Sequence, residues 1–104
     1  MSYGKLVRDK IPKIIEDNGE KPIIRTLLEK EYIEELEKKL LEECNEVINS
    51  NGSDRLEELA DVLEVLMALA KSENSSFEDV TKIADKKREK RGGFNDKIFL
   101  EGVE

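Results

Sequence analysis

The chain has 104 residues, of which 41% are charged and 38% hydrophobic, and a formal net charge of −7. This length predicts a single domain covering residues 1–104, and the acidic balance argues against nucleic acid as a partner, because a phosphate backbone is bound by an excess of cations. Cys44 is the only cysteine and histidine is absent, which excludes an internal disulfide, a cysteine-rich zinc site and nucleophiles that depend on imidazole.

The first quarter of the chain predicts a short helix and a linker. Pro12 suits the first turn of a helix, and Asn18-Gly19 is a stop signal. Residues 21–26 are then expected to form an extended linker. No stretch approaches the ~20 apolar residues of a membrane span, and no apolar run of signal-peptide type follows the first basic residues. We therefore expect no membrane partner and a cytoplasmic location.

Two long helices are predicted in the middle of the chain. From about residue 28 to 49, apolar residues recur at three- and four-residue steps, which predicts a helix with Cys44 as a small core residue. After a loop of strong helix breakers, Ser53 or Asp54 is predicted to cap a second helix that runs to about Ser72. This second helix is apolar over a wide arc, which predicts burial on more than one side and favours a subunit interface.

A third long helix is expected from near Ser76 to Gly92-Gly93, and residues 94–104 are expected as a short extended piece folded back. Helices joined by a short loop pack antiparallel to each other. The elements therefore predict an all-α fold, an antiparallel helical bundle that assembles into a homodimer or homotetramer.

The two central helices carry matched pairs of acidic residues. Glu43 and Glu46 lie on the first helix, and Glu58 and Asp61 lie on the second, so that each pair shares one helical face. The helical period places Glu43 and Glu58 at the edge of the apolar stripe rather than on the solvent face. Antiparallel packing is expected to bring the two pairs together.

Four carboxylates at the edge of a core repel one another, so they must hold either protons or a cation. Oxygen ligands without cysteine or histidine suit a hard ion, Mg²⁺ or Mn²⁺, which takes substrate phosphate as a further ligand. The alternative is that these acids are solvated surface charges of a non-catalytic helical interaction module.

The sequence resembles the MazG-type all-α nucleoside triphosphate pyrophosphohydrolases, in which E-x-x-E on one helix is followed by E-x-x-D on the next. These motifs stand here as Glu43 to Glu46 and Glu58 to Asp61, and residues 5–12 and 87–94 look like the ends of a compact subgroup. The resemblance implies a helical bundle, an obligate oligomer, Mg²⁺ dependence, release of pyrophosphate, and metal-binding and catalytic roles for the four acids. A relative, phosphoribosyl-ATP pyrophosphohydrolase, shares the acidic pattern and is the alternative assignment.

Cations near both ends of the chain are candidates for binding the phosphates of a nucleotide substrate. Lys5 and Arg8 precede the first helix, whereas Lys87 and Arg91 are i, i+4 neighbours at the end of the third. A purely structural alternative exists for the second pair, because cations near a helix C-terminus are favoured by the helix dipole.

Together with these patterns, the resemblance implies an Mg²⁺-dependent enzyme that hydrolyses a nucleoside triphosphate to a monophosphate and pyrophosphate, a reaction suited to nucleotide-pool housekeeping. The four acids are expected to hold one or two Mg²⁺ ions, and one of them to orient water toward the α-phosphorus.

Overall fold

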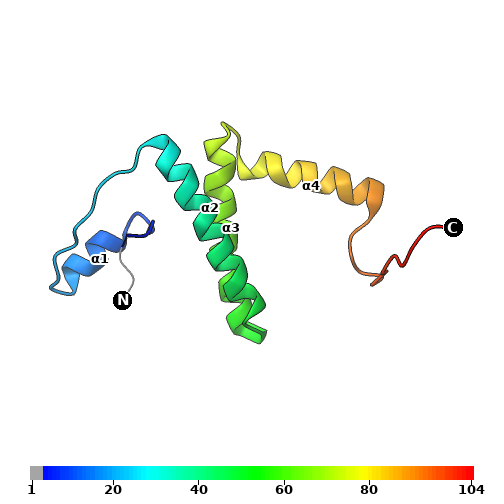
Figure 1. The fold of residues 1–104 in the computed structure, drawn as a ribbon, viewed down its shortest axis with the longest axis horizontal. Helices are drawn as coiled ribbons and strands as arrows, with labels where there is room; N and C mark the ends of the chain where they lie inside the picture. Colours follow the sequence, from blue (N-terminus) through cyan, green and yellow to red (C-terminus); the bar gives the residue numbers. More distant parts are fainter. Residues whose placement is uncertain (1–3) are drawn as a thin grey trace.

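The computed structural model describes residues 4–104. These residues form four α-helices and no strands: α1 (Ile11–Asp17), α2 (Glu29–Ile48), α3 (Gly52–Ser72) and α4 (Phe77–Arg91). The all-α class is therefore confirmed over the described part of the chain (Figure 1). None of these helices combines the length and the apolar character needed to cross a membrane.

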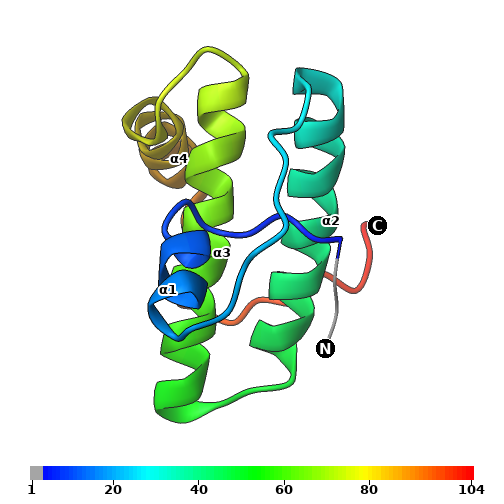
Figure 2. The same ribbon diagram turned by 90° about the vertical axis from the view of Figure 1, so that its left-hand side faces the viewer.

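The centre of the molecule is a pair of long helices, α2 and α3, which run side by side in opposite directions (Figure 2). The buried side chains of the described residues lie on these two helices, and Leu36 on α2 is the most buried, at 3% exposed. The connecting turn is held by Arg55, whose Nε donates to the carbonyls of Val47 at 3.2 Å and Ser50 at 2.9 Å. This turn sets the register in which the two acidic motifs face each other.

The start of α3 differs from the prediction by one or two residues. Neither Ser53 nor Asp54 is the cap; the helix begins at Gly52, and Asn51 is the N-cap residue without a side-chain cap hydrogen bond. The physical reason lies in Gly52, whose φ of 57° falls in the left-handed region and lets the chain turn directly into the helix.

Helix α4 has the predicted bounds because its end signals are local. The Ser76 hydroxyl accepts a hydrogen bond from the Asp79 amide at 3.1 Å, and Gly92 ends the helix with a φ of 81°. The helix projects crosswise from the end of α3, which is the helix it contacts (Figure 1). No residue of α4 is buried.

The overall shape is extended, with principal dimensions of 62 × 33 × 23 Å. The radius of gyration is 17.9 Å, whereas a compact chain of this length has about 13 Å. The described helices form one antiparallel pair, and a bundle requires further helices packed against it. The tail was expected to fold back, but its apolar side chains are exposed, and Phe94 is 99% exposed.

Cys44 is exposed, so the prediction of a core residue was wrong within the described chain. It lines a shallow apolar depression together with residues of both long helices, Val47, Ile48, Leu59 and Val62. The three- and four-residue spacing identified an apolar face correctly, but no element of the described chain covers that part of it.

Candidate functional site

Three of the four predicted acids converge where α2 and α3 pack together. One carboxylate oxygen each from Glu43 on α2 and from Glu58 and Asp61 on α3 lie within 4.8 Å of one another, and all three residues are partly buried. Their convergence follows from the sequence, because the i, i+3 spacing puts Glu58 and Asp61 on one face of α3 and the short turn brings that face against α2.

The electrostatics of this cluster favour a bound cation. Burial raises the pKa of Glu43, and the negative charge of Asp61 adds to this effect. Burial also raises the pKa of Glu58, where repulsion from Glu46, Asp61 and Glu43 contributes further. Each carboxylate would therefore be easier to ionise if a positive ion lay among them.

The donor set fits Mg²⁺. At a metal–oxygen distance of about 2.1 Å, octahedral ligands are about 3 Å apart when adjacent and about 4.2 Å apart when opposite. The three carboxylate oxygens lie within 4.8 Å of one another, a bound that is near the separation of opposite ligands. Three hard oxygen donors without sulfur or imidazole match the preference of Mg²⁺ and Mn²⁺.

Glu46, the fourth predicted acid, lies one turn beyond Glu43 on α2 and is exposed. It is not among the three residues whose oxygens converge. Its charge nevertheless raises the pKa of Glu58, so it lies close enough to add negative potential to the cluster.

Arg8 joins the N-terminal segment to this cluster. Its Nη2 donates to Oδ1 of Asp61 at 2.7 Å, and its Nη1 lies 3.9 Å from Oε1 of Glu64. The sequence predicted a phosphate-binding role for Arg8, and the structure places it on an acid of the cluster. Its side chain is 54% exposed, so solvent reaches the guanidinium beside the cluster.

Lys39 is a neighbour of the cluster that the sequence reasoning missed. Its Nζ lies 3.8 Å from Oε1 of Glu43, and the two side chains are only 20% and 14% exposed. Its charge partly offsets the effect of burial on the pKa of Glu43. The signal was present, because Lys39 and Glu43 are i, i+4 neighbours on one helix.

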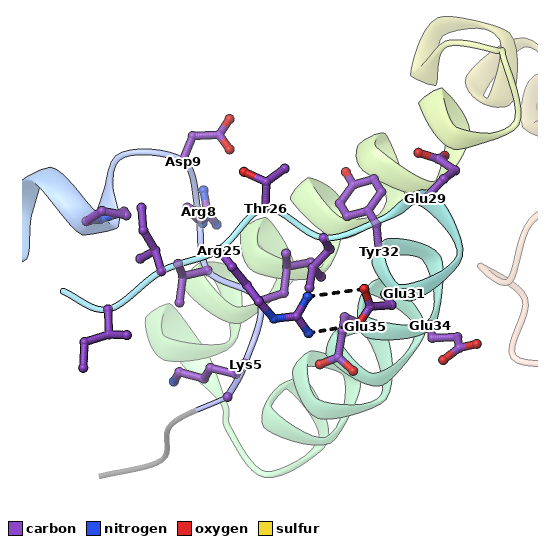
Figure 3. Close-up of a pocket in the computed structure, with 17 residues that line it drawn as sticks. Lys5, Arg8, Asp9, Arg25, Thr26, Glu29, Glu31, Tyr32, Glu34 and Glu35 are labelled. Carbon is purple, nitrogen blue, oxygen red and sulfur yellow. Dashed lines mark hydrogen bonds and ion pairs between the residues drawn. The ribbon is translucent and has the colours of Figure 1, made fainter.

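A groove of about 950 Å³ lies between the N-terminal part of the described chain and the start of α2 (Figure 3). It is lined by the N-terminal segment, by residues 23–27 of the linker and by the first turns of α2, and Lys5 and Arg8 are among its lining residues. Arg25 from the linker donates to both oxygens of Glu31, at 3.3 and 2.9 Å, and thereby lowers the pKa of that carboxyl. Because Arg8 lines the groove and also contacts Asp61, the groove and the carboxylates are adjacent.

Lys87 and Arg91 are not brought to the cluster within one copy of the chain. They lie in the last two turns of α4, at the end that points away from the α2–α3 pair (Figure 1). Of the four predicted phosphate-binding cations, the structure therefore places Arg8 at the acids, Lys5 in the neighbouring groove, and the other two on the projecting helix.

The fold and the site define an all-helical protein with a cluster of oxygen donors between two antiparallel helices. The profile of the MazG nucleotide pyrophosphohydrolase domain matches residues 31–93, and the chain belongs to this family. The matched range contains the four acids, Lys87 and Arg91, whereas Lys5 and Arg8 precede it.

An uncharacterized protein of Mycolicibacterium smegmatis is 49% identical over 51 residues. The similar region covers 49% of this chain, and the chain spans about half of that relative, 52% of its length. No solved structure matches the chain.

Proposed function

We propose that the protein hydrolyses a nucleoside triphosphate to a nucleoside monophosphate and pyrophosphate, in a reaction that depends on Mg²⁺. The observation that carries the proposal is the convergence of Glu43, Glu58 and Asp61 from two helices of a chain that belongs to the MazG family. Partly buried acids that repel one another are costly unless a cation binds them, and such a cation is what phosphoryl chemistry requires.

In this proposal Glu43, Glu58 and Asp61 hold the ion, and Glu46 lies near enough to join them. Mg²⁺, when bound, supplies positive charge to the triphosphate oxygens and makes water a better nucleophile. The cluster residues fix the place of this charge, because they stand on two helices that pack along each other. Arg8 contributes a second positive charge. Its guanidinium, which contacts Asp61, can leave that carboxylate and bind a phosphate instead.

The bond changes are those of a hydrolysis at the α-phosphorus. The oxygen of a water molecule forms a bond to the α-phosphorus, and the bond from that phosphorus to the oxygen bridging to the β-phosphorus breaks. The electron pair of the broken bond leaves with pyrophosphate. A carboxylate that does not bind the ion takes the proton of the water, and Glu46 lies close enough to the cluster to do so.

The groove next to Arg8 is the proposed binding site for the base and sugar of the nucleotide. Tyr32 from α2 contributes an aromatic ring to its wall, and Arg25 and Glu31 contribute hydrogen-bonding groups (Figure 3). With the phosphates at the carboxylates, a nucleoside would extend past Arg8 into this space.

The test is product identification with a panel of ribo- and deoxyribonucleoside triphosphates, together with phosphoribosyl-ATP. In the presence of Mg²⁺, phosphorus NMR should detect pyrophosphate and the monophosphate, and addition of EDTA should stop the reaction. Formation of orthophosphate and the diphosphate would refute attack at the α-phosphorus. Turnover of phosphoribosyl-ATP with no turnover of the ordinary triphosphates would reassign the substrate while retaining the chemistry.

A further inference from the structure

The groove contains a cation that is not directed at the carboxylate cluster. Lys5, Arg8 and Arg25 are the cations that line the groove. Arg8 contacts Asp61, whereas the guanidinium of Arg25 reaches from the linker to the first turn of α2, where it contacts Glu31 (Figure 3). The groove therefore has one cation beside the acids and another on the wall that α2 forms.

The contact with Glu31 fixes the plane of the Arg25 guanidinium and leaves a second pair of donors. A guanidinium carries its N–H donors in one rigid plane. Glu31 accepts from Nη1 at 3.3 Å and from Nη2 at 2.9 Å. The Nε–H and the outer N–H of Nη2 point in parallel from another edge of the same plane, and Nε of Arg25 donates to no group within residues 4–104. Because the side chain is 68% exposed, a ligand in the groove can reach this edge.

The surroundings of Arg25 suit a neutral ligand rather than a phosphate. Glu31 already pairs with its charge, and Glu35, one turn further along α2, lies close enough to contribute to the raised pKa of Arg25. Arg25 in turn lowers the pKa of Glu31, so this carboxylate stays ionised at neutral pH. A phosphate at this place would be repelled by the two carboxylates, whereas an uncharged base would not.

Two parallel donors select a base by its acceptors. They require two acceptors side by side, as in the pairing of arginine with O6 and N7 of guanine. Adenine has an amino group in place of O6, which would set a donor against a donor. Among the pyrimidines, cytosine presents N3 and O2 as adjacent acceptors, whereas uracil and thymine carry N3–H between their two carbonyl groups.

The length of α2 between Glu31 and the cluster fits a nucleotide. Glu31 and Glu43 lie twelve positions apart on this helix, which is about 18 Å. A bound ion, a phosphate, a sugar and a base placed end to end cover a distance of this order. A base beside Arg25 can therefore belong to a nucleotide whose phosphates are at the carboxylates.

We infer that Arg25, held in place by Glu31, is the specificity-determining residue of the groove and selects guanine and cytosine nucleotides over those of adenine, uracil and thymine. Arg25 binds the base, and Glu31 is the positioning residue that fixes the plane of the guanidinium. The inference rests on the proposed function for the place of the phosphates, whereas the choice of base follows from the free donors of Arg25.

Triphosphate analogues that cannot be cleaved test the choice of base without turnover. In these analogues a methylene group replaces the oxygen between the α- and β-phosphorus. In Mg²⁺ buffer, calorimetry should show at least about fivefold tighter binding of the guanosine analogue than of the adenosine analogue, and of the cytidine analogue than of the uridine analogue, because a bidentate contact discriminates by this factor or more. A preference within one pair alone would name that base as the ligand of Arg25, and equal affinities within both pairs would overturn the inference.

Variants of the ion pair assign the preference to Arg25. Arg25→Lys keeps the charge but has no planar pair of donors, so it should bring the affinity ratios to within about twofold of unity. Glu31→Gln should also lower the ratios, because it removes the charge that holds the guanidinium. Lys21→Ala is the matched control, since Lys21 is an exposed linker cation outside the groove lining, and it should keep the wild-type ratios. Ratios that are unchanged in Arg25→Lys would overturn the inference and leave the ion pair as a structural link between the linker and α2.

Turnover of the natural triphosphates separates this inference from the proposed function. A protein that hydrolyses all of them and binds all analogues equally would refute the choice of base and retain the function. A protein that prefers the guanosine or cytidine analogue through Arg25, yet hydrolyses no nucleotide, would support the base site and refute the hydrolysis. Binding of none of the analogues would overturn both.

Discussion

The α2–α3 pair and the α4 region have equally clear helix signals but very different surroundings. The pair buries Leu36, Val65 and Ala70 and brings three acids together. Helix α4 has a good N-cap and a glycine at its end, yet it buries no residue. The difference shows that local signals suffice to define a helix, whereas its place in a fold depends on a surface to pack against.

The largest expected effect is a loss of activity from a substitution in the α2–α3 pair that leaves α4 unchanged. Glu58→Gln should reduce kcat/KM by about 100- to 1,000-fold, as expected when a charged group that supports the transition state is lost. Because the substitution removes repulsion that raises the pKa of this carboxyl, the metal-free variant should melt no lower than wild type. Steady-state kinetics and thermal melts in EDTA measure the two effects.

Glu57→Gln is the matched control, since Glu57 is the exposed neighbour of Glu58. It should keep wild-type kinetics. Equal losses in both variants would show that the acids act as surface charge, as the interaction-module alternative requires.

The next effect compares the stability of the two regions. Leu36→Ala removes a side chain that is 3% exposed and should lower the free energy of unfolding by about 3 kcal/mol. Ile83→Ala on α4 should lower it by no more than about 1 kcal/mol, because the Ile83 side chain is 56% exposed. Denaturant titrations measure both losses, and a loss for Ile83→Ala as large as that for Leu36→Ala would show that the Ile83 side chain is covered in solution.

A smaller effect concerns pH. The pKa values of Glu43 and Glu58 are raised in the folded protein, so in the absence of metal their contribution to stability is present below the usual carboxyl pKa and is lost as the pH rises through the raised values. Mg²⁺ binds the ionised form, and at 100 times its dissociation constant it stabilises by about 2.7 kcal/mol. Thermal melts should therefore show a larger shift on adding Mg²⁺ in mildly alkaline than in mildly acidic buffer.

Glu58→Gln should reduce this pH-dependent shift, because it removes one of the two perturbed carboxyls. A shift that is the same across the pH range, or larger in acid, would mean that Mg²⁺ does not compete with protons at this cluster.

The smallest effect is confined to the start of α4. Ser76→Ala removes the hydroxyl that accepts from the Asp79 amide and should cost about 1 kcal/mol. Hydrogen exchange should show the loss in the first turn of α4 and leave the α2–α3 pair unchanged. Faster exchange in α2 as well would show that the two regions unfold together.

Much of the helical framework and the acidic cluster could be predicted, because the interactions that decide them join residues close together in the sequence. Ser76 and Gly92 mark the ends of α4 through contacts within four residues. The helical period places Glu43 and Glu58 at the margin of the apolar face, and both are partly buried. Lys39 was equally accessible to this reasoning, since it lies four residues from Glu43 on the same helix.

The features that escaped prediction join segments far apart in the chain. Arg8 contacts Asp61 across 53 positions, and no spacing rule connects a residue before α1 with one inside α3. The exposure of Cys44 and of the tail also depends on which other element covers an apolar face. An apolar pattern in the sequence does not indicate which element that is.

By itself, the sequence determined the helices, the lack of histidine and of an internal disulfide, and the face of each helix on which the acids lie, because composition is fixed by the chain and periodicity and capping act within one or two turns. Only the tertiary structure decided that three of the acids converge, that Arg8 and Lys39 accompany them, and that α4 carries its cations away from them. These outcomes depend on how separate elements meet, and the packing energy of such contacts is shared by residues that are distant in the sequence.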